Sequence, residues 1–261
     1  MTIRSALLLI LALAASLAAS RPASAERLVV SLSSHRVLVT SNFVGEQIVL
    51  FGTVERDSAT VRRRGGYDLV VTVTGPRETL VTRRKERVLG IWVNVDSRTF
   101  VNVPSYLAVL ANKPFDQIAA PDTLRRLQIG LENTLLPQQI GVDLADVVRD
   151  DPFRAAFLRL KSERSLYREE PNAVTFLTGN LFRATIPLPA GVPIGNYDVD
   201  IKLFADGAVI ARTTSALEII KSGFEQFVVT AARDHALSYG LATAAMAIMT
   251  GWFASIIFRR D

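Results

Sequence analysis

The C-terminal part of the chain carries an unbroken run of 23 uncharged residues, 236–258. As an α-helix this run would extend about 35 Å, which is enough to cross a hydrocarbon core of about 30 Å. Charged residues border the run on both sides. Tyr239 and Trp252 fall near the two membrane interfaces, where amphipathic rings are favoured. The run therefore predicts a transmembrane helix over 236–258, followed by a short tail, 259–261.

The N-terminal residues 1–25 have the pattern of a secretory signal peptide. Arg4 provides the positive charge in front of an apolar stretch, 6–19, and the small residues Ala23-Ser24-Ala25 are typical of a signal-peptidase site. We expect cleavage before Glu26. The alternative is an uncleaved N-terminal anchor.

The two ends together predict a topology. A secretory signal and one later span leave the bulk of the chain on the periplasmic side of a bacterial inner membrane. Arg259 and Arg260 then lie in the cytoplasm, in agreement with the positive-inside rule, although Arg233 partly offsets them. We expect a single-pass inner-membrane protein with a cytoplasmic C-terminus.

Composition excludes several classes of protein and site. With 49% hydrophobic and 21% charged residues, the chain is neither disordered nor a transporter with many spans. The absence of cysteine excludes disulfides, cysteine nucleophiles and zinc sites built from cysteine. With only two histidines, a histidine-rich metal site is not expected either.

Residues 26–114 have the pattern of β-strands. Apolar residues alternate with others, the period of half-buried strands, in four short stretches: 28–32, 37–39, 48–50 and 69–73. No helical segment separates these stretches, so we expect a sandwich and not a parallel sheet. A further strand is predicted over 88–95, with Trp92 buried in it; the alternative places Trp92 on a partner surface.

Residues 115–170 change to a helical period and are predicted to form a helical insert. A first helix is indicated by leucines at helical spacing after Pro121: Leu124, Leu127, Leu131 and Leu135. A second helix is expected to begin near Asp151-Pro152, with proline in its first turn, and to stop at Pro171. Its predicted buried face consists of Phe153, Ala156, Phe157 and Leu160. We interpret both stripes as core packing.

Strands return in residues 171–220. Asp206-Gly207 predicts a hairpin. The run 189–197, Pro-x-Gly-x-Pro-x-Gly-x-Tyr, stands just before a strand and resembles the late strands of immunoglobulin-like domains, a likeness of fold and not of function. We therefore expect a mainly β protein, an immunoglobulin-like β-sandwich with a helical insert and one C-terminal transmembrane helix. The strands of 171–220 either complete that sandwich or form a second small one.

A helical linker is predicted between the β domain and the membrane, residues 221–235, because its apolar residues share one helical face. The membrane helix itself carries small residues spaced by three or four: Gly240, Ala244, Ala247 and Gly251. Such a ridge lets another helix approach closely. It would suit a membrane-protein partner or a homo-oligomer.

Few residues are candidates for chemistry. His35 is predicted in an exposed turn and His235 at the membrane boundary, where solvation explains both. Asp143, Asp146, Asp150 and Asp151 could supply paired carboxylates, but helix starts and a solvated face account for them better. The sequence contains no nucleophilic-serine motif, no glycine-rich phosphate-binding loop and no zinc-hydrolase motif. We predict no catalytic, cofactor-binding or metal-binding residues and no enzyme activity.

A basic segment, 56–87, stands out by its charge. It holds nine basic residues, Arg56, Arg62, Arg63, Arg64, Arg77, Arg83, Arg84, Lys85 and Arg87. Four acidic residues leave a net charge of +5, nine minus four. Nucleic acid is not expected outside the cytoplasm, so the candidates are an anionic partner, anionic lipid headgroups or an anionic solute. The favoured alternative is a solvated hairpin face whose charges discourage strand pairing.

Several stretches resemble an alphaproteobacterial family of putative transmembrane proteins of unknown function. They are Gly90-Ile91-Trp92-Val93-Asn94, residues 103–109, residues 221–227 and Gly251-Trp252-Phe253. The resemblance covers essentially the mature chain and implies a signal, a β-rich periplasmic domain and a C-terminal span. It also implies an association with sulfite or anion exporters, and it carries no catalytic residues.

These observations favour a non-enzymatic, membrane-anchored periplasmic protein that serves as an accessory or partner-binding subunit of a membrane system such as an anion exporter. A second hypothesis is an envelope structural or assembly factor that uses an open sheet edge. A third is a periplasmic enzyme with a carboxylate site on the helical insert. The sequence does not identify the partner, the ligand or the oligomeric state.

Overall fold

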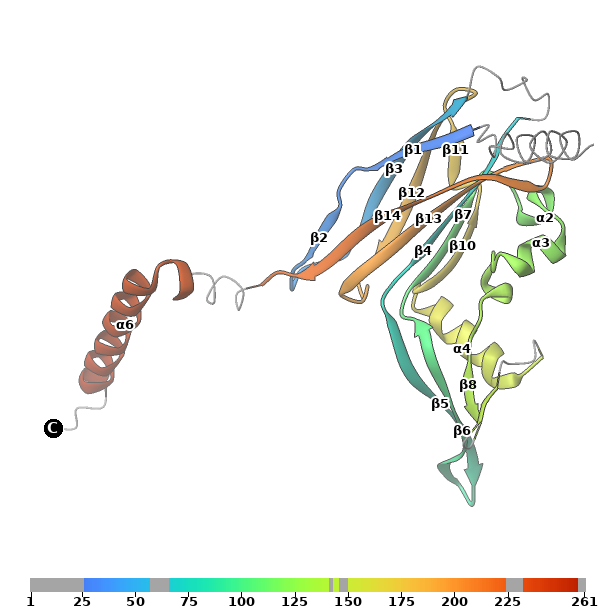
Figure 1. Ribbon diagram of the computed structural model, residues 1–261. Helices are drawn as coiled ribbons and strands as arrows, with labels where there is room; N and C mark the ends of the chain where they lie inside the picture. The colour runs from blue at the N-terminus through green and yellow to red at the C-terminus, as the bar shows by residue number, and fades with distance from the viewer. Residues whose placement is uncertain (1–25, 57–65, 141–142, 146–149, 224–231, 258–261) are drawn as a thin grey trace, which may run out of the picture.

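The computed structural model of the chain describes residues 26–56, 66–140, 143–145, 150–223 and 232–257. Figure 1 shows two facing β-sheets, a long hairpin that extends beyond them and short helices on one side. One long apolar helix, α6 (Ala236–Ile257), is a candidate membrane span. The predicted mainly β fold with a C-terminal apolar helix is confirmed. The predicted signal peptide, 1–25, and most of the predicted linker, 224–231, lie outside the described residues.

The two sheets pack face to face. The first has four strands in the order β1 (Glu26–Leu32), β3 (Gly45–Arg56), β12 (Leu181–Pro189) and β11 (Val174–Phe176). The second has six, in the order β10 (Tyr167–Pro171), β7 (Leu107–Ala111), β4 (Asp68–Thr74), β13 (Gly195–Ala205), β14 (Ala208–Lys221) and β2 (Arg36–Val39). Alternate apolar side chains of both sheets point inward, as the period of two requires, and form one shared core that includes Leu50 and Ile201.

The strand order is that of an immunoglobulin-like sandwich. Strands β1, β3, β12 and β11 occupy the A, B, E and D positions of such a domain, and β4, β13 and β14 occupy the C, F and G positions. Strand β7 extends the second sheet beside β4, and β2 pairs in parallel with β14 at the opposite edge. The strands of 171–220 therefore pair within the same two sheets as the earlier strands.

Tyr197 fixes the corner between β12 and β13. Its ring is fully buried, and its hydroxyl donates a 2.5 Å hydrogen bond to the carbonyl oxygen of Pro193. Burial raises the pKa of Tyr197 above its ordinary value, so the hydroxyl stays protonated and can donate. Immunoglobulin domains use a tyrosine in the same way at the start of strand F. The proline- and glycine-rich run before Tyr197 thus forms this corner.

The insert covers part of the outer face of the six-stranded sheet. Its elements are α2 (Phe115–Ile118), α3 (Pro121–Arg126), the 3-10 helix η1 (Leu131–Asn133), β8 (Gln138–Ile140), β9 (Asp143–Ala145) and α4 (Pro152–Glu163). Apolar residues of the insert form a second core with the outward residues of the sheet, Val70, Val109 and Phe204. The six-stranded sheet is therefore buried on both faces over part of its area.

The first predicted helix is wrong beyond Arg126. Gln128 and Gly130 have φ values of 54° and 97°, a left-handed conformation that a right-handed helix cannot continue through. The leucines that follow at helical spacing therefore do not share one face, and Leu135 is exposed.

The second predicted helix is confirmed at its start, Pro152, and in the burial of Phe153 and Phe157. Leu160, predicted to be buried, is exposed. The helix ends at Glu163, and Pro171 closes strand β10 instead.

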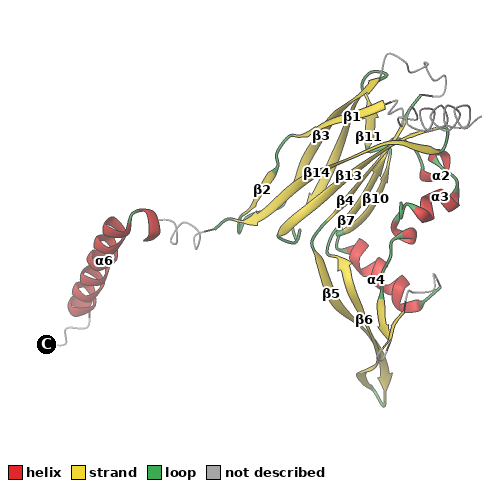
Figure 2. Cartoon of the chain, viewed as in Figure 1, coloured by secondary structure: helices red, strands yellow, loops and turns green. Residues whose placement is uncertain are grey.

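Strands β5 (Arg77–Val88) and β6 (Ile91–Pro104) form the long hairpin. The strand predicted over 88–95 is divided in the structure: Leu89 and Gly90 form the turn between the two strands, and residues 91–95 belong to β6. Figure 2 shows α4 lying alongside the hairpin. Phe100 of β6 stacks on Phe157 of α4 with 4.4 Å between ring centroids, and Lys161 donates a 2.7 Å hydrogen bond to Glu78 of β5. These contacts hold the root of the hairpin against the helix.

Tyr197→Phe tests the corner. The substitution removes one hydrogen bond and leaves the carbonyl of Pro193 without its donor, so we expect the free energy of unfolding to fall by about 1–3 kcal/mol. Urea unfolding of the full chain in detergent, followed by near-ultraviolet circular dichroism, measures this change. Tyr239→Phe on α6 is the matched control and should change nothing. A corner variant as stable as the control would contradict the assignment.

Candidate functional site

The two histidines are exposed, one just before β2 and the other just before α6. His35 is exposed at the start of β2, and its Nδ1 lies 3.2 Å from the carbonyl oxygen of Ala216, which joins β2 to β14. His235 is exposed just before α6. Its carbonyl oxygen accepts hydrogen bonds from the backbone of Tyr239 and the hydroxyl of Ser238. The ring of His35 thus contacts a strand far away in the sequence, whereas His235 takes part in these hydrogen bonds through its backbone carbonyl.

The four aspartates do not form a described carboxylate pair. Asp151 is the N-cap of α4: its carboxylate accepts from the backbone of Phe153 and Arg154 and from the side chain of Gln138. Asp150 is exposed. Asp143 lies in β9, its side chain is not described, and Asp146 lies outside the described residues. Within the part of the chain that the structure describes, no three His, Asp or Glu side chains gather as metal ligands.

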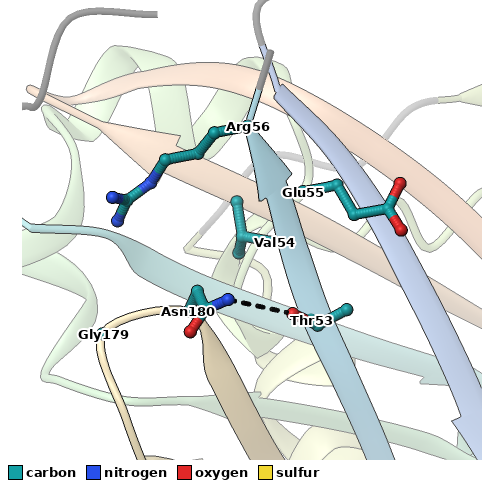
Figure 3. A pocket seen from close by; sticks show the side chains of 6 residues that line it. All are labelled: Thr53, Val54, Glu55, Arg56, Gly179 and Asn180. Atoms are coloured by element: carbon teal, nitrogen blue, oxygen red, sulfur yellow. Dashed lines mark hydrogen bonds between the residues drawn. The ribbon is translucent and has the colours of Figure 1, made fainter. Parts of the chain in front are cut away.

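A depression at one end of β3 also lacks converging chemical groups. Figure 3 shows Glu55 and Arg56, which line it, pointing in opposite directions, as neighbours on a strand do. The amide of Asn180 donates a 3.4 Å hydrogen bond to Thr53 across its floor. Arg56 donates to the hydroxyl of Tyr67 and lies 5.3 Å from the centre of its ring. This basic residue therefore has a structural partner.

The tip of the β5–β6 hairpin is the most unusual surface of the molecule. Large apolar side chains cover it and are exposed: Val88, Leu89, Ile91, Trp92, Val93 and Val95. Leu89 is 98% exposed and Trp92 66%. The prediction that Trp92 is buried is therefore wrong, because its strand continues past the described elements that could cover it. We call these six residues the apolar tip.

The turn of the apolar tip is strained. Leu89 and Gly90 have φ values of 49° and 86°, as in a two-residue turn whose twist matches the strands. Glycine adopts this conformation freely, but for leucine it costs about 1–2 kcal/mol. Leu89 contributes no burial to offset that cost. Strain and exposed apolar surface together favour a role in binding.

Basic residues follow directly behind the apolar tip. Residues 83–95 contain Arg83, Arg84, Lys85 and Arg87 against Glu86, so their net charge is four minus one, or +3. All five charged side chains are exposed. Arg84 pairs with Glu86, while Arg83 and Lys85 have no ionic or hydrogen-bond partner among the described residues. Arg62, Arg63 and Arg64 of the predicted basic segment lie outside the described residues.

The hairpin leaves the sandwich at the same end as the chain that leads to α6. Asp198 of β13 pairs with Thr74, just before the hairpin, and with Ala216 of β14, near the end of that strand. Gly195, whose partner in β14 is Ile219, lies against Pro76 at the root of the hairpin. β14 then ends at Lys221. The root of the hairpin and the exit toward the apolar helix are therefore neighbours.

The small-residue ridge of α6 is exposed along its length. A side-chain carbon added at Gly240 or Gly251 would meet no atom within 4 Å. The described part of the chain thus does not cover the ridge, and its packing against another helix stays a prediction.

Comparison with protein families gives a match over most of the chain. Residues 27–260 match the family described as "Putative transmembrane protein (Alph_Pro_TM)". No curated protein matches the chain.

Leu89→Asn tests the strain in the apolar tip. Asparagine tolerates a left-handed conformation better than leucine. Because the leucine side chain is exposed, its removal sacrifices no buried apolar surface. The free energy of unfolding should therefore rise by about 1 kcal/mol. Leu89→Ala is the control, because it removes the same apolar surface and keeps the unfavourable backbone. Urea unfolding compares the two. Equal stability of the Asn and Ala variants would contradict the strain.

Proposed function

Since the chain belongs to this transmembrane protein family, we propose that it is a non-enzymatic, single-pass inner-membrane protein whose periplasmic sandwich docks through the apolar tip onto the anionic surface of the same membrane. The observation that carries the proposal is the apolar tip with its basic flank, at the end of the sandwich from which the chain leads to α6. The protein would thus be attached at two points, the span and the hairpin.

The chemistry of the hairpin suits a lipid surface. Tryptophan and large aliphatic side chains are favoured at the boundary of headgroups and acyl chains. Each lysine or arginine near an anionic surface contributes about 1 kcal/mol. Arg83 and Lys85, which have no described protein partner, are free to contact headgroups. A water-facing hairpin would not need the apolar residues that this tip carries.

The tether keeps the domain within reach of the bilayer. Residues 224–231, between the described end of the sandwich and the helical segment that leads into α6, can span at most about 28 Å when fully extended. The hairpin strands have 12 and 14 residues, a length of about 40 Å. A domain held this close and a hairpin this long support contact between the apolar tip and the membrane.

Docking of this kind would give the protein an accessory role. A sandwich held close to the membrane is positioned to meet a membrane-protein partner that diffuses in the same bilayer, and the ridge of α6 offers a helix face for that partner. The resemblance noted in the sequence favours an anion exporter as that partner. Affinity purification of the full chain from gently solubilised membranes would identify it.

The topology can be tested with reporter fusions. Alkaline phosphatase, which is active only outside the cytoplasm, should be active when fused after residue 230, because the signal exports everything before the span. A fluorescent protein that matures only in the cytoplasm should be fluorescent when fused at residue 261. An inactive phosphatase fusion would contradict the periplasmic placement.

Docking of the apolar tip can be tested with the two tryptophans of the chain, Trp92 and Trp252. Trp252→Phe leaves Trp92 as the only reporter on the hairpin, and Trp92→Phe leaves Trp252 as a reporter in the span. The fluorescence of each tryptophan is measured in vesicles that contain brominated phosphatidylcholine as quencher. The fluorescence of Trp252, in the span, should be quenched whether or not phosphatidylglycerol is present. Trp92 should be quenched when phosphatidylglycerol is present and much less without it, because attraction to anionic headgroups draws the hairpin to the surface.

Two double variants separate local charge from total charge. Arg83→Gln with Lys85→Gln should weaken quenching of Trp92, while Arg27→Gln with Arg183→Gln removes the same charge from exposed residues of the first sheet and should have no effect. If Trp92 stays unquenched where Trp252 is quenched, lipid docking is wrong. If, in that case, a photocrosslinking residue at position 89 forms a crosslink to a membrane protein, the apolar tip binds a protein and not the lipid surface.

A further inference from the structure

A cleft of about 700 Å³ lies on the outer face of the six-stranded sheet, beside the root of the hairpin. It forms because the insert covers only part of that face. Along β4 the outward residues change from apolar Val70 to Thr72 and Thr74, and along β13 they change from Phe204 to Lys202 and Asp200. The apolar part lies under the insert. The polar part stays open and is roofed by the segment that follows α3, 127–137.

The cleft is strongly basic. Four cationic side chains line it, Arg77, Arg126, Lys202 and Arg212, against the single carboxylate of Asp200, so its net charge is +3, four minus one. Lys202 is only 6% exposed, which is rare for lysine. A buried cation of this kind needs compensating charge nearby.

Asp200 compensates part of this charge. Arg212 donates to both of its oxygens, at 2.7 and 3.1 Å, and Lys202 donates to one of them. Burial opposes the charge of Asp200, but the hydrogen bonds from Arg212 and Lys202 outweigh burial and hold the pKa of this carboxyl below its usual range. Asp200 therefore stays ionised, orients two cations at the floor of the cleft and leaves the others uncompensated.

Two polar groups in the cleft lack a described partner. Arg126 at the end of α3 has no hydrogen bond or ion pair with any described residue, although its neighbour Arg125 is paired with Asp122. The hydroxyl oxygen of Thr72 is buried beside Asp200 and has no hydrogen-bond partner. Unsatisfied buried groups are uncommon in native proteins. Apolar side chains complete the wall: Leu107, Leu127 and Leu135.

We propose that this cleft binds a small organic oxyanion, a molecule with a phosphate-, sulfate- or carboxylate-type group and an apolar body. Arg126, Lys202 and Arg212 hold the oxyanion, since guanidinium and ammonium donors form strong charge-assisted bonds with such groups. The hydroxyl of Thr72 donates to it. The apolar body lies along Leu127 and Leu135. This site is independent of the apolar tip and goes beyond the docking role.

Isothermal titration calorimetry of the full chain in a non-ionic detergent, at constant ionic strength, tests the site with phenyl phosphate and inorganic phosphate as probes. Phenyl phosphate should bind more tightly, because only it has a body for the leucine wall. Arg126→Gln should weaken binding of both probes about tenfold, the effect of losing one charge-assisted bond. Leu135→Ser should remove the preference for phenyl phosphate and leave inorganic phosphate unchanged.

Arg125→Gln is the matched control. Arg125 lies next to Arg126 on α3 but does not line the cleft, and its substitution removes the same charge. Binding should be unchanged in this variant. Thr72→Val keeps the shape of the side chain and should weaken binding without lowering the melting temperature, since the native hydroxyl has no partner to lose.

The source of the oxyanion is separated by repeating the titration in nanodiscs. Loss of phenyl phosphate binding in phosphatidylglycerol discs, with binding kept in phosphatidylcholine discs, assigns the site to a lipid headgroup. Binding in both assigns it to a soluble oxyanion. Absence of binding heat for both probes in the unaltered protein, or an equal loss in the Arg125 and Arg126 variants, overturns the proposal.

Discussion

The rest of the structure depends on the burial of the six-stranded sheet on both of its faces. The inward residues of β4 and β13 complete the sandwich core, and the outward residues Val70 and Phe204 require a second cover. The insert provides that cover with Phe157 and the apolar residues around it. Because this burial is the main source of stability, it also fixes α4, and α4 in turn holds the root of the hairpin through Lys161 and Glu78.

Beyond that root the hairpin lacks the burial of apolar side chains that stabilises the rest of the domain. Its apolar residues are exposed and Leu89 is strained, features that natural proteins keep where binding requires them. The cleft shows the same pattern on a smaller scale, with the buried cation Lys202 and the unpaired hydroxyl of Thr72. The hairpin leaves the sandwich at the end from which the chain leads toward α6, and the cleft lies beside the root of that hairpin.

Sequence patterns predicted those elements whose signal is local. The proline- and glycine-rich run before Tyr197 indicated the late strands of an immunoglobulin-like domain, and Asp151-Pro152 gave the correct helix start, because caps and turns act over a few residues. Sequence patterns failed where the backbone conformation of one or two residues interrupts the helix or strand that the spacing of apolar residues predicted. Gln128 and Gly130 end the helix that the leucines suggested, and the turn at Leu89 divides the strand in which Trp92 was expected to be buried.

The sequence by itself determined the mainly β class, the immunoglobulin-like strands and the apolar helix at 236–257, because alternation, turn residues and an uncharged run of membrane length are properties of neighbouring residues. Only the tertiary structure decided that Trp92 is exposed and that Thr72, Arg126, Lys202 and Arg212 line one cleft. These residues come from four separate elements, and the pairing of β4, β13 and β14 beneath the insert brings them together. A one-dimensional pattern shows which face of a strand a residue occupies, but what covers that face is set by long-range packing.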